Sequence, residues 1–296
     1  MGNILTKQFY RQRKDFEDSC AGRDAGLTFP EGVICSTDIA YADDGIKAHV
    51  LDIYRPEDSQ EKILPVIINV HGGGLIIGNK EFNRYFCALL CKKGFLVYSI
   101  EYRLIPDCLI YDQIADVFMA MDYIKERLAA DGGDSSHVYM AGDSGGACLI
   151  TYANAIQNST NIARAANVTP SGLRINALGL ISGMFYTSRF DKIGLFLPKY
   201  LYGRDYKKTP FAKYVNPENR ELLNSLAPVW LVTSHNDFLR RYTTDFEKAL
   251  TRAEREHELV VFTKNKKLTH AFSVFEPFLP ESSAVIDMMV EYLRKF

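Results

Sequence analysis

Short apolar runs alternate with longer amphipathic stretches along most of this 296-residue chain. Runs rich in Val, Ile and Leu, bounded by polar or glycine-containing segments, predict buried β-strands. The predicted strands are Ala48–Tyr54, Val66–Val70, Phe95–Glu101, Val138–Ala141, Ala177–Ile181, Val229–Ser234 and Leu259–Thr263. Between them, Glu81–Lys93 and Tyr111–Ala130 read as crossover helices. The alternation predicts an α/β fold, with a mainly parallel central sheet that helices cover on both faces.

Two segments do not follow this alternation. The first is residues 1 to about 35, which begins as a charged helical stretch. The second is residues 183 to about 217, which is rich in Phe, Tyr and Lys. We expect both to lie outside the regular layers of the sheet and its covering helices.

One predicted strand runs directly into a serine flanked by glycines. Val138–Ala141 is followed by Gly142-Asp143-Ser144-Gly145-Gly146 and then by a helix-compatible run. A strand, a sharp G-x-S-x-G turn and a helix together are typical of a nucleophile elbow, which exposes the serine hydroxyl at the start of the helix. The free amides and the dipole at that helix end favour developing negative charge. We therefore predict that Ser144 is a nucleophile, and that Asp143 is structural because successive side chains diverge at the elbow.

A glycine-rich turn follows an earlier strand. Val66–Val70 leads into His71-Gly72-Gly73-Gly74, and in lipases and esterases an H-G-G-G turn supplies backbone N–H groups to an oxyanion hole. A plain strand-to-helix turn is the alternative, which the downstream elbow disfavours. We predict that the oxyanion donors are the amides of Gly73, Gly74 and Gly145.

The partners of Ser144 should follow it in the chain, first an acid and then a histidine. Of the histidines after Ser144, His235 comes too early, and His257 lies in what we interpret as a charged, solvated helix end. His270 follows the last predicted strand and is the expected general base.

The acid is expected just after the strand Val229–Ser234, where Asp237 can reach back to the imidazole. Asp245 and Glu247 lie on the following predicted helix and are interpreted as exposed charges. Asp237 would accept a hydrogen bond from Nδ1 of His270, fix its tautomer and stabilise the imidazolium.

With these motifs, the chain from about residue 50 to 296 resembles the hormone-sensitive-lipase-like, H-G-G-G type carboxylesterase family of α/β-hydrolases. Further matches are Glu101-Tyr102-Arg103-Leu104-Ile105-Pro106-Asp107 and Thr269-His270-Ala271-Phe272. The resemblance implies an α/β-hydrolase fold with a helical cap. We expect one domain over 1–296, with cap elements from about 1–35 and 183–217.

The chain departs from the family pattern at a few positions. Gly145 stands where the family usually has Ala, and Ala271 stands where it usually has Gly. If that position needs a positive φ, alanine is strained there. Glu101 and Asp107 replace Asp and Glu, so both acidic groups are retained. None of these changes removes a catalytic group.

The composition limits the classes of molecule that the protein is expected to bind. A formal net charge of −1 gives no electrostatic basis for binding nucleic acid or an anionic membrane, and 47% hydrophobic content supports a sizeable core. Short basic clusters such as Arg11-Gln12-Arg13-Lys14 are interpreted as solvated faces. That cluster also interrupts any N-terminal signal peptide. The six cysteines are dispersed along the chain, and we expect them to be reduced thiols of a cytoplasmic protein. Their spacing does not match a metal-binding motif.

These features predict a serine carboxylesterase that hydrolyses short-acyl esters of small soluble molecules without a metal or organic cofactor. Two alternatives stay open. One is an amide-cleaving hydrolase, such as a formamidase or small peptidase, that uses the same triad. The other is a ligand-binding protein on this scaffold, against which His270 argues. The sequence also leaves open whether the chain forms a homo-oligomer. Aromatic residues could wall a closed acyl pocket: Phe185, Tyr186, Phe190, Phe196, Tyr200 and Tyr202, joined by Phe9 and Tyr10. The aromatic residues of the 183–217 segment could equally form the core of a small helical layer.

Overall fold

The computed structural model describes residues 2–59 and 62–296, with side chains from Leu5 onward. Residue 1 of the N-terminal segment expected to join the cap lies outside this part. The strands are β1 (Val33–Ala40), β2 (Val50–Pro56), β3 (Leu64–Val70), β4 (Leu96–Ile100), β5 (Gly133–Asp143), β6 (Ala177–Ile181), β7 (Val229–Ser234) and β8 (His257–Phe262). The α-helices are α1 (Gly2–Asp24), α2 (Arg84–Lys92), α3 (Ile110–Arg127), α4 (Ser144–Asn158), α5 (Thr160–Ala166), α6 (Lys192–Phe196), α7 (Pro198–Leu201), α8 (Arg220–Asn224), α9 (Arg240–Arg252), α10 (Phe272–Phe275) and α11 (Pro280–Leu293). The short 3₁₀ turns are η1 (Glu57–Ser59), η2 (Lys80–Asn83), η3 (Tyr206–Lys208) and η4 (Pro210–Tyr214).

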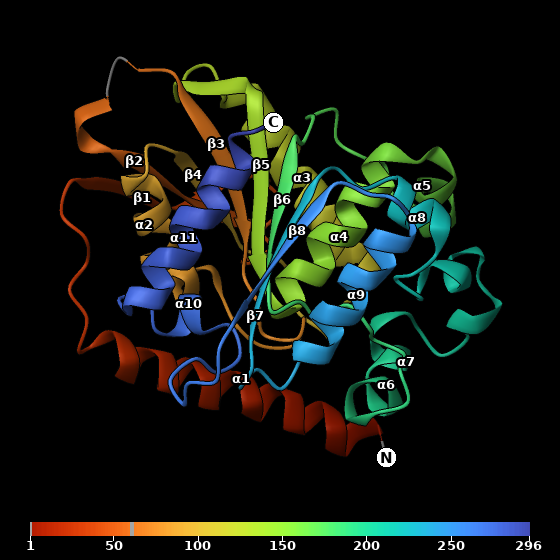
Figure 1. Ribbon diagram of the computed structural model, residues 1–296. Helices are drawn as coiled ribbons and strands as arrows, with labels where there is room; N and C mark the ends of the chain where they lie inside the picture. The colour runs from red at the N-terminus through yellow and green to blue at the C-terminus, as the bar shows by residue number, and fades with distance from the viewer. Residues whose placement is uncertain (1, 60–61) are drawn as a thin grey trace.

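The strands form one sheet in the order β1-β2-β4-β3-β5-β6-β7-β8 (Figure 1). From β4 to β8 all neighbours are parallel, whereas β2 is antiparallel to both β1 and β4. The prediction of a mainly parallel sheet flanked by helices, the α/β-hydrolase fold, is confirmed.

Every strand predicted from the apolar runs is present, although several ends move. β5 starts at Gly133 rather than Val138, and β8 starts at His257 rather than Leu259. The interpretation of His257 as part of a helix end is therefore wrong, since α9 ends at Arg252. The sequence pattern does not predict β1, because this edge strand is mostly exposed and lacks a continuous apolar run.

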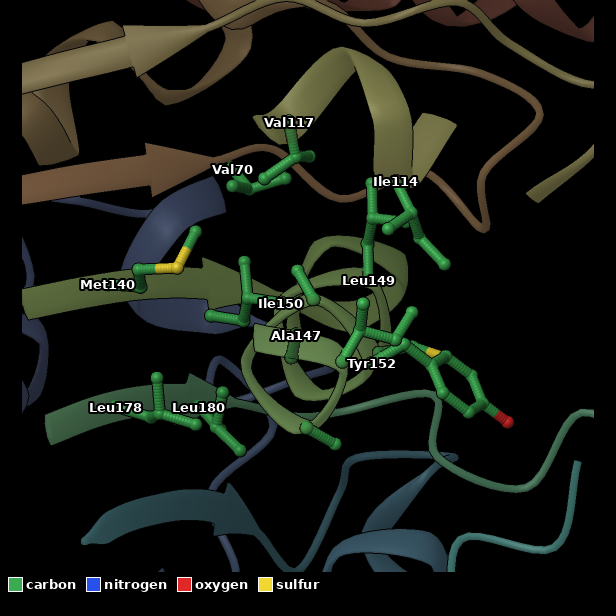
Figure 2. Packing of buried hydrophobic residues seen from close by; sticks show 14 of the residues in the cluster. Val70, Ile114, Val117, Met140, Ala147, Leu149, Ile150, Tyr152, Leu178 and Leu180 are labelled. Carbon is green, nitrogen blue, oxygen red and sulfur yellow. The ribbon is translucent and has the colours of Figure 1, made fainter. Parts of the chain in front are cut away.

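The sheet has a hydrophobic cluster on each face. Successive side chains of β3 point to opposite faces of the sheet and so belong to different clusters. Val66, Ile68 and Val70 pack on the side of α3 and α4, whereas Ile67 packs on the side of α2 and α11. Figure 2 shows Ala147 and Ile150 of α4 between residues of the sheet and of α3. Every residue of α4 from Ser144 to Ile156 is buried. This packing immobilises the helix whose first residue is Ser144.

The two segments that broke the alternation lie near the carboxyl ends of the parallel strands. α1 runs along this edge of the sheet, with its N-terminal end beside α6 and its C-terminal half beside α10 (Figure 1). Phe9 of α1 meets Tyr200 of α7 at 5.2 Å between ring centroids, and Phe16 meets Phe275 of α10 at 6.5 Å. Among the described residues, no helix is long and apolar enough to cross a membrane.

Candidate active site

Ser144 occupies the sharp turn between β5 and α4. Its φ of 49° lies in the left-handed region, and its side chain is almost buried, with 8% exposed. The turn leaves no room for side chains around it, because a Cβ at Gly146 would lie 2.1 Å from the carbonyl oxygen of Val70. The strained serine and the crowded glycine are the geometry expected of a nucleophile elbow.

His270 lies on the loop between β8 and α10, next to Ser144. The distance from His270 Nε2 to Ser144 Oγ is 2.9 Å, so the imidazole can accept the serine proton. The loop is held by hydrogen bonds to the ends of two strands. The amide of Ala271 donates to Ser182 Oγ over 3.1 Å, and the hydroxyl of Ser234 donates to the carbonyl of Leu268.

Asp237 follows β7 and contacts the other ring nitrogen of the histidine. His270 Nδ1 lies 2.7 Å from Asp237 Oδ1, which also accepts from the amide of Leu239, while Oδ2 accepts from the hydroxyl of Thr233 over 2.7 Å. Burial alone would raise the pKa of Asp237, but its hydrogen bonds, chiefly from His270, outweigh burial and lower the pKa below its usual range. The carboxylate is therefore ionised at neutral pH and can hold the imidazole proton on Nδ1.

The glycine-rich turn after β3 faces the serine. The carbonyl of Gly73 accepts from the amides of Ile76 and Ile77, which closes a tight turn, and φ is +103° at Gly73 and +63° at Gly74. No acceptor in the described part of the chain takes the amides of Gly73 and Gly74. The amide of Gly145 is in the first turn of α4, where N–H groups lack helical partners. These three amides can serve an oxyanion.

A buried polar network supports this turn. His71 Nδ1 lies 2.8 Å from the carbonyl of Gly72, and Nε2 lies 2.9 Å from Glu101 Oε1. Both partners are acceptors, so the ring satisfies both only as the imidazolium. Burial opposes the charge, but the carboxylate of Glu101 outweighs it and raises the pKa of His71. Asp143, which the sequence analysis interpreted as structural, accepts from the amide of Gly72 over 3.0 Å and from Asn83 over 2.9 Å.

An apolar pocket of about 410 Å³ opens above Ser144 and His270. Its apolar side chains come from the oxyanion turn, α1, the segment after β6 and the loops that carry the acid and the base: Phe9, Phe16, Ile76, Ile77, Met184, Ile193, Phe196, Leu197, Phe238, Leu239 and Phe275. Phe238 is 74% exposed, and its ring centroid lies 4.4 Å from that of His270.

The expectation that the aromatic residues after position 183 wall the pocket is largely wrong. Only Phe196 of that group lines it, together with Phe9 from α1. Phe185 is stacked on Phe246 in the core, and Tyr202 is buried beside Tyr152. Phe190 is 92% exposed. Aromatic composition alone does not tell a pocket wall from a packed layer beneath it.

Other interpretations of charged side chains also need correction. Arg13 is not part of a solvated face, because its side chain is only 18% exposed and reaches the carbonyl of Ile76. Asp245 is half-buried and pairs with Arg189 at 2.9 Å. Thr233 and Ser182 were not predicted as site residues, although polar residues at the carboxyl ends of predicted strands are a usable signal. In residues 2–59 and 62–296, no three His, Cys, Asp or Glu side chains gather as metal ligands would.

A strand–serine–helix elbow, a histidine after the last strand and an acid after the strand before it define this chain as an α/β-hydrolase. A family model described as alpha/beta hydrolase fold matches residues 67–274. The chain belongs to this family, in its hormone-sensitive-lipase-like branch.

Two curated plant proteins are among its relatives. "Probable isoprenylcysteine alpha-carbonyl methylesterase" from Oryza sativa subsp. japonica is 29% identical over 184 residues, which cover 58% of this chain and 44% of that protein. "Tuliposide A-converting enzyme b1, amyloplastic" from Tulipa gesneriana is 30% identical over 131 residues, which cover 40% of this chain and 35% of that protein. The chain thus spans less than half the length of these relatives.

Among solved structures, esterase B from Lactobacillus rhamnosis superimposes with a TM-score of 0.92 at 22% identity, over 100% of this chain and 96% of that one. A bacterial heroin esterase superimposes with a TM-score of 0.72, also at 22% identity, over 98% of this chain and 92% of that one. At such identity the superpositions establish the shared fold.

Proposed function

We propose that this protein is a serine carboxylesterase that hydrolyses short-acyl esters of small soluble molecules through an acyl-enzyme intermediate. The observation that carries the proposal is the continuous contact from Ser144 Oγ to His270 Nε2, at 2.9 Å, and from His270 Nδ1 to Asp237 Oδ1, at 2.7 Å. This contact chain ends at an apolar pocket beside the amides of Gly73 and Gly74, for which the described residues offer no acceptor. Such an arrangement is suited to acyl transfer.

In the first step, Ser144 Oγ attacks the ester carbonyl while His270 Nε2 takes the hydroxyl proton. Asp237 keeps the other proton on Nδ1 and stabilises the imidazolium. The tetrahedral intermediate then collapses, and His270 returns the proton to the departing alcohol. In the second step, water attacks the acyl-enzyme with His270 as base, which releases the acid and restores Ser144.

The negative oxygen of each tetrahedral intermediate would lie among the amides of Gly73, Gly74 and Gly145. Removal of one such donor from a serine hydrolase typically lowers kcat by about 10²–10³. The turn that carries Gly73 and Gly74 is closed by its own hydrogen bonds, so these donors are aligned before substrate arrives.

The size of the pocket supports short acyl chains. A volume of about 410 Å³ lies near the lower end of small-molecule sites. Each methylene buried there contributes about 0.8 kcal/mol until the wall is reached. We expect kcat/KM to peak at acyl chains of about two to six carbons. Esterase B was solved inhibited by a C4-C4 tributyrin phosphonate, and that fold-sharing neighbour supports the same range.

We further propose that residues 1–296 form one hydrolase domain in which segments near 1–35 and 183–217 act as a cap. The contacts of Phe9 with Tyr200 and of Phe16 with Phe275 support a roof built from both segments and α10. A cytoplasmic location is part of the proposal, supported by six cysteines that are all free thiols.

The test compares the wild type with Ser144→Ala and with a control, Ser283→Ala, which makes the same change at an exposed serine of α11. p-Nitrophenyl esters from acetate to decanoate are assayed beside the matching p-nitroanilides. We expect the wild type and Ser283→Ala to prefer esters with short chains, and Ser144→Ala to lose turnover while remaining folded.

Three outcomes would contradict the proposal. Ester turnover in Ser144→Ala above a few per cent of wild type excludes this nucleophile. Faster cleavage of anilides than of esters indicates an amidase. Efficient hydrolysis of emulsified long-chain triglycerides, with a rate increase above the solubility limit, indicates a lipase.

A further inference from the structure

α1 covers the pocket through one face. Phe9, Arg13 and Phe16 are spaced i, i+4 and i+7, so they share that face. Phe9 and Phe16 both line the pocket. Phe16 also packs on Phe82, with 4.9 Å between ring centroids. The position of α1 therefore sets the distance between two aromatic walls of the pocket and Ser144.

Arg13, between these two rings, is bound to the body of the protein at three points. Nε donates to the carbonyl of Ile76 over 2.7 Å, and Nη2 donates to the carbonyl of Ile105 over 2.6 Å. Nη1 pairs with Asp107 at 2.8 Å, and Tyr10 of the same helix also donates to that carboxylate. One side chain of α1 thus joins the segment after β3 to the segment after β4.

Both carbonyls belong to the support of the oxyanion turn. The amide of Ile76 donates to the carbonyl of Gly73 over 3.1 Å, and the amide of Ile105 donates to the carbonyl of Leu75 over 3.0 Å. The carbonyl of Ile76 is in the same peptide unit as the amide of Ile77, which donates to the carbonyl of Gly73 over 3.0 Å. Arg13 therefore binds the far side of one peptide that closes the turn, and it also binds Ile105, the residue whose amide holds Leu75. A shift of the Arg13 guanidinium would therefore displace Gly73 and Gly74 through one peptide unit.

We propose that Arg13 is a positioning residue that fixes the roof helix α1 and the Gly73–Ile77 turn to each other, so that it sets both the acyl-length limit and the alignment of the oxyanion donors. This inference rests on the esterase function proposed above. It assigns a role to a side chain that the sequence pattern places among solvated charges.

The carbonyl bonds, rather than the ion pair, should carry this role. The Asp107 side chain is 48% exposed, and solvent weakens such a pair, whereas Arg13 is 18% exposed. The planar guanidinium supplies several donors in one fixed fork, which an ammonium group cannot reproduce. Arg13→Lys should therefore behave as a defective variant, and Asp107→Asn as a mild one.

The experiment measures kcat and KM for p-nitrophenyl acetate, butyrate and octanoate in the wild type, Arg13→Gln, Arg13→Lys and Asp107→Asn. The matched control is Arg11→Gln, the same change on the same helix at a side chain that is 84% exposed. Thermal unfolding shows which variants are folded. A change of fold stability alone would not alter how the folded enzyme ranks acyl lengths.

We expect Arg13→Gln to lower kcat by about tenfold on all three esters, a fraction of the 10²–10³ loss for a missing oxyanion donor. We also expect the butyrate-to-octanoate ratio of kcat/KM to fall at least about threefold, because a loosened roof admits longer chains. Arg13→Lys should show both effects to a smaller degree. Arg11→Gln should stay within about twofold of wild type.

A folded Arg13→Gln with the kcat and acyl preference of Arg11→Gln overturns the inference. If Arg13→Gln does not fold, Arg13→Lys decides by the same two readouts, and wild-type values for both overturn it. A wild type that cleaves no ester instead contradicts the proposed function, so the two failures are distinct.

Discussion

Gly145 lies against the backbone of Gly74: a Cβ at position 145 would be 2.9 Å from the Gly74 nitrogen and 2.8 Å from that of Leu75. Two of the proposed oxyanion donors are thus in close contact across the site, and the glycine permits it. We predict that Gly145→Ala displaces the turn by a few tenths of an ångström and lowers kcat by about tenfold, with little change in KM. Steady-state kinetics on a short p-nitrophenyl ester measures this.

Gly22→Ala is the control for that substitution, since nothing lies within 4 Å of a Cβ there. It sits in α1 and should leave kcat unchanged. An unaltered kcat in Gly145→Ala would mean that the turn carrying Gly74 can shift without loss of activity. Close packing at Gly145 would then not be what aligns the oxyanion donors.

The His71–Glu101 pair predicts a pH dependence of stability. Because the folded pKa of His71 is raised, the pair stabilises the fold fully below the unfolded value near 6.5, and this contribution is lost as the pH rises through the folded value. We expect Glu101→Gln to remove on the order of 1 kcal/mol or more at pH 6. The gap from wild type should narrow towards pH 9.

Urea unfolding at pH 6, 7, 8 and 9 measures that gap. Glu291→Gln, on an exposed position of α11, is the control and should shift stability equally little at every pH. A gap between Glu101→Gln and wild type that is constant from pH 6 to 9 contradicts a charged His71.

The triad predicts a pH dependence of rate. The pKa of Asp237 is lowered below its usual range, so its carboxylate stays ionised from pH 5 to 8. Its titration therefore causes no change of kcat/KM in that range. His270 must be neutral to take the serine proton, so its protonation removes activity. We expect kcat/KM to fall towards pH 5 along a single limb. A flat profile of kcat/KM from pH 5 to 8, measured under conditions where the enzyme stays folded, would exclude His270 as the base.

Ala271 has a left-handed backbone, with φ of 49° and ψ of 35°, and is fully buried. The family usually has Gly at this position, and the backbone strain expected there for alanine is therefore present. Ala271→Gly should relieve about 1–2 kcal/mol of strain, roughly offsetting the lost methyl contact and the flexibility of Gly. We predict a change in unfolding free energy within about 1 kcal/mol.

The matched variant is Ala249→Gly, at a buried alanine of α9 with ordinary helical backbone. There no strain is relieved, so the substitution should cost about 1 kcal/mol more than Ala271→Gly. Denaturant unfolding of both proteins compares them directly. Equal destabilisation argues that Ala271 is not held in the left-handed region in solution.

The candidate site was largely predictable because its parts occupy fixed places relative to strands. Ser144, Asp237 and His270 each follow a strand, and parallel strands bring their carboxyl ends to one edge. Chain order then selected among a few histidines. The same logic could have found Thr233, the second-last residue of β7, and Ser182, which directly follows β6.

The roof of the pocket could not be predicted in this way. Arg13 and Arg11 are two residues apart on one charged helix, yet one is 18% exposed and the other 84%. Helical periodicity separates their faces but does not tell which face meets the body of the protein. Likewise β1 is an edge strand with few buried positions, so its sequence resembles a loop.

The central claim, that Ser144 is the nucleophile, is tested most directly by covalent labelling. The folded protein is treated with a p-nitrophenyl alkylphosphonate, and intact-mass and peptide mass spectrometry are followed beside residual activity. We predict one adduct per chain, on Ser144, with activity lost in proportion to labelling, and no adduct in Ser144→Ala. An adduct on another residue, or full activity in fully labelled protein, would contradict the account.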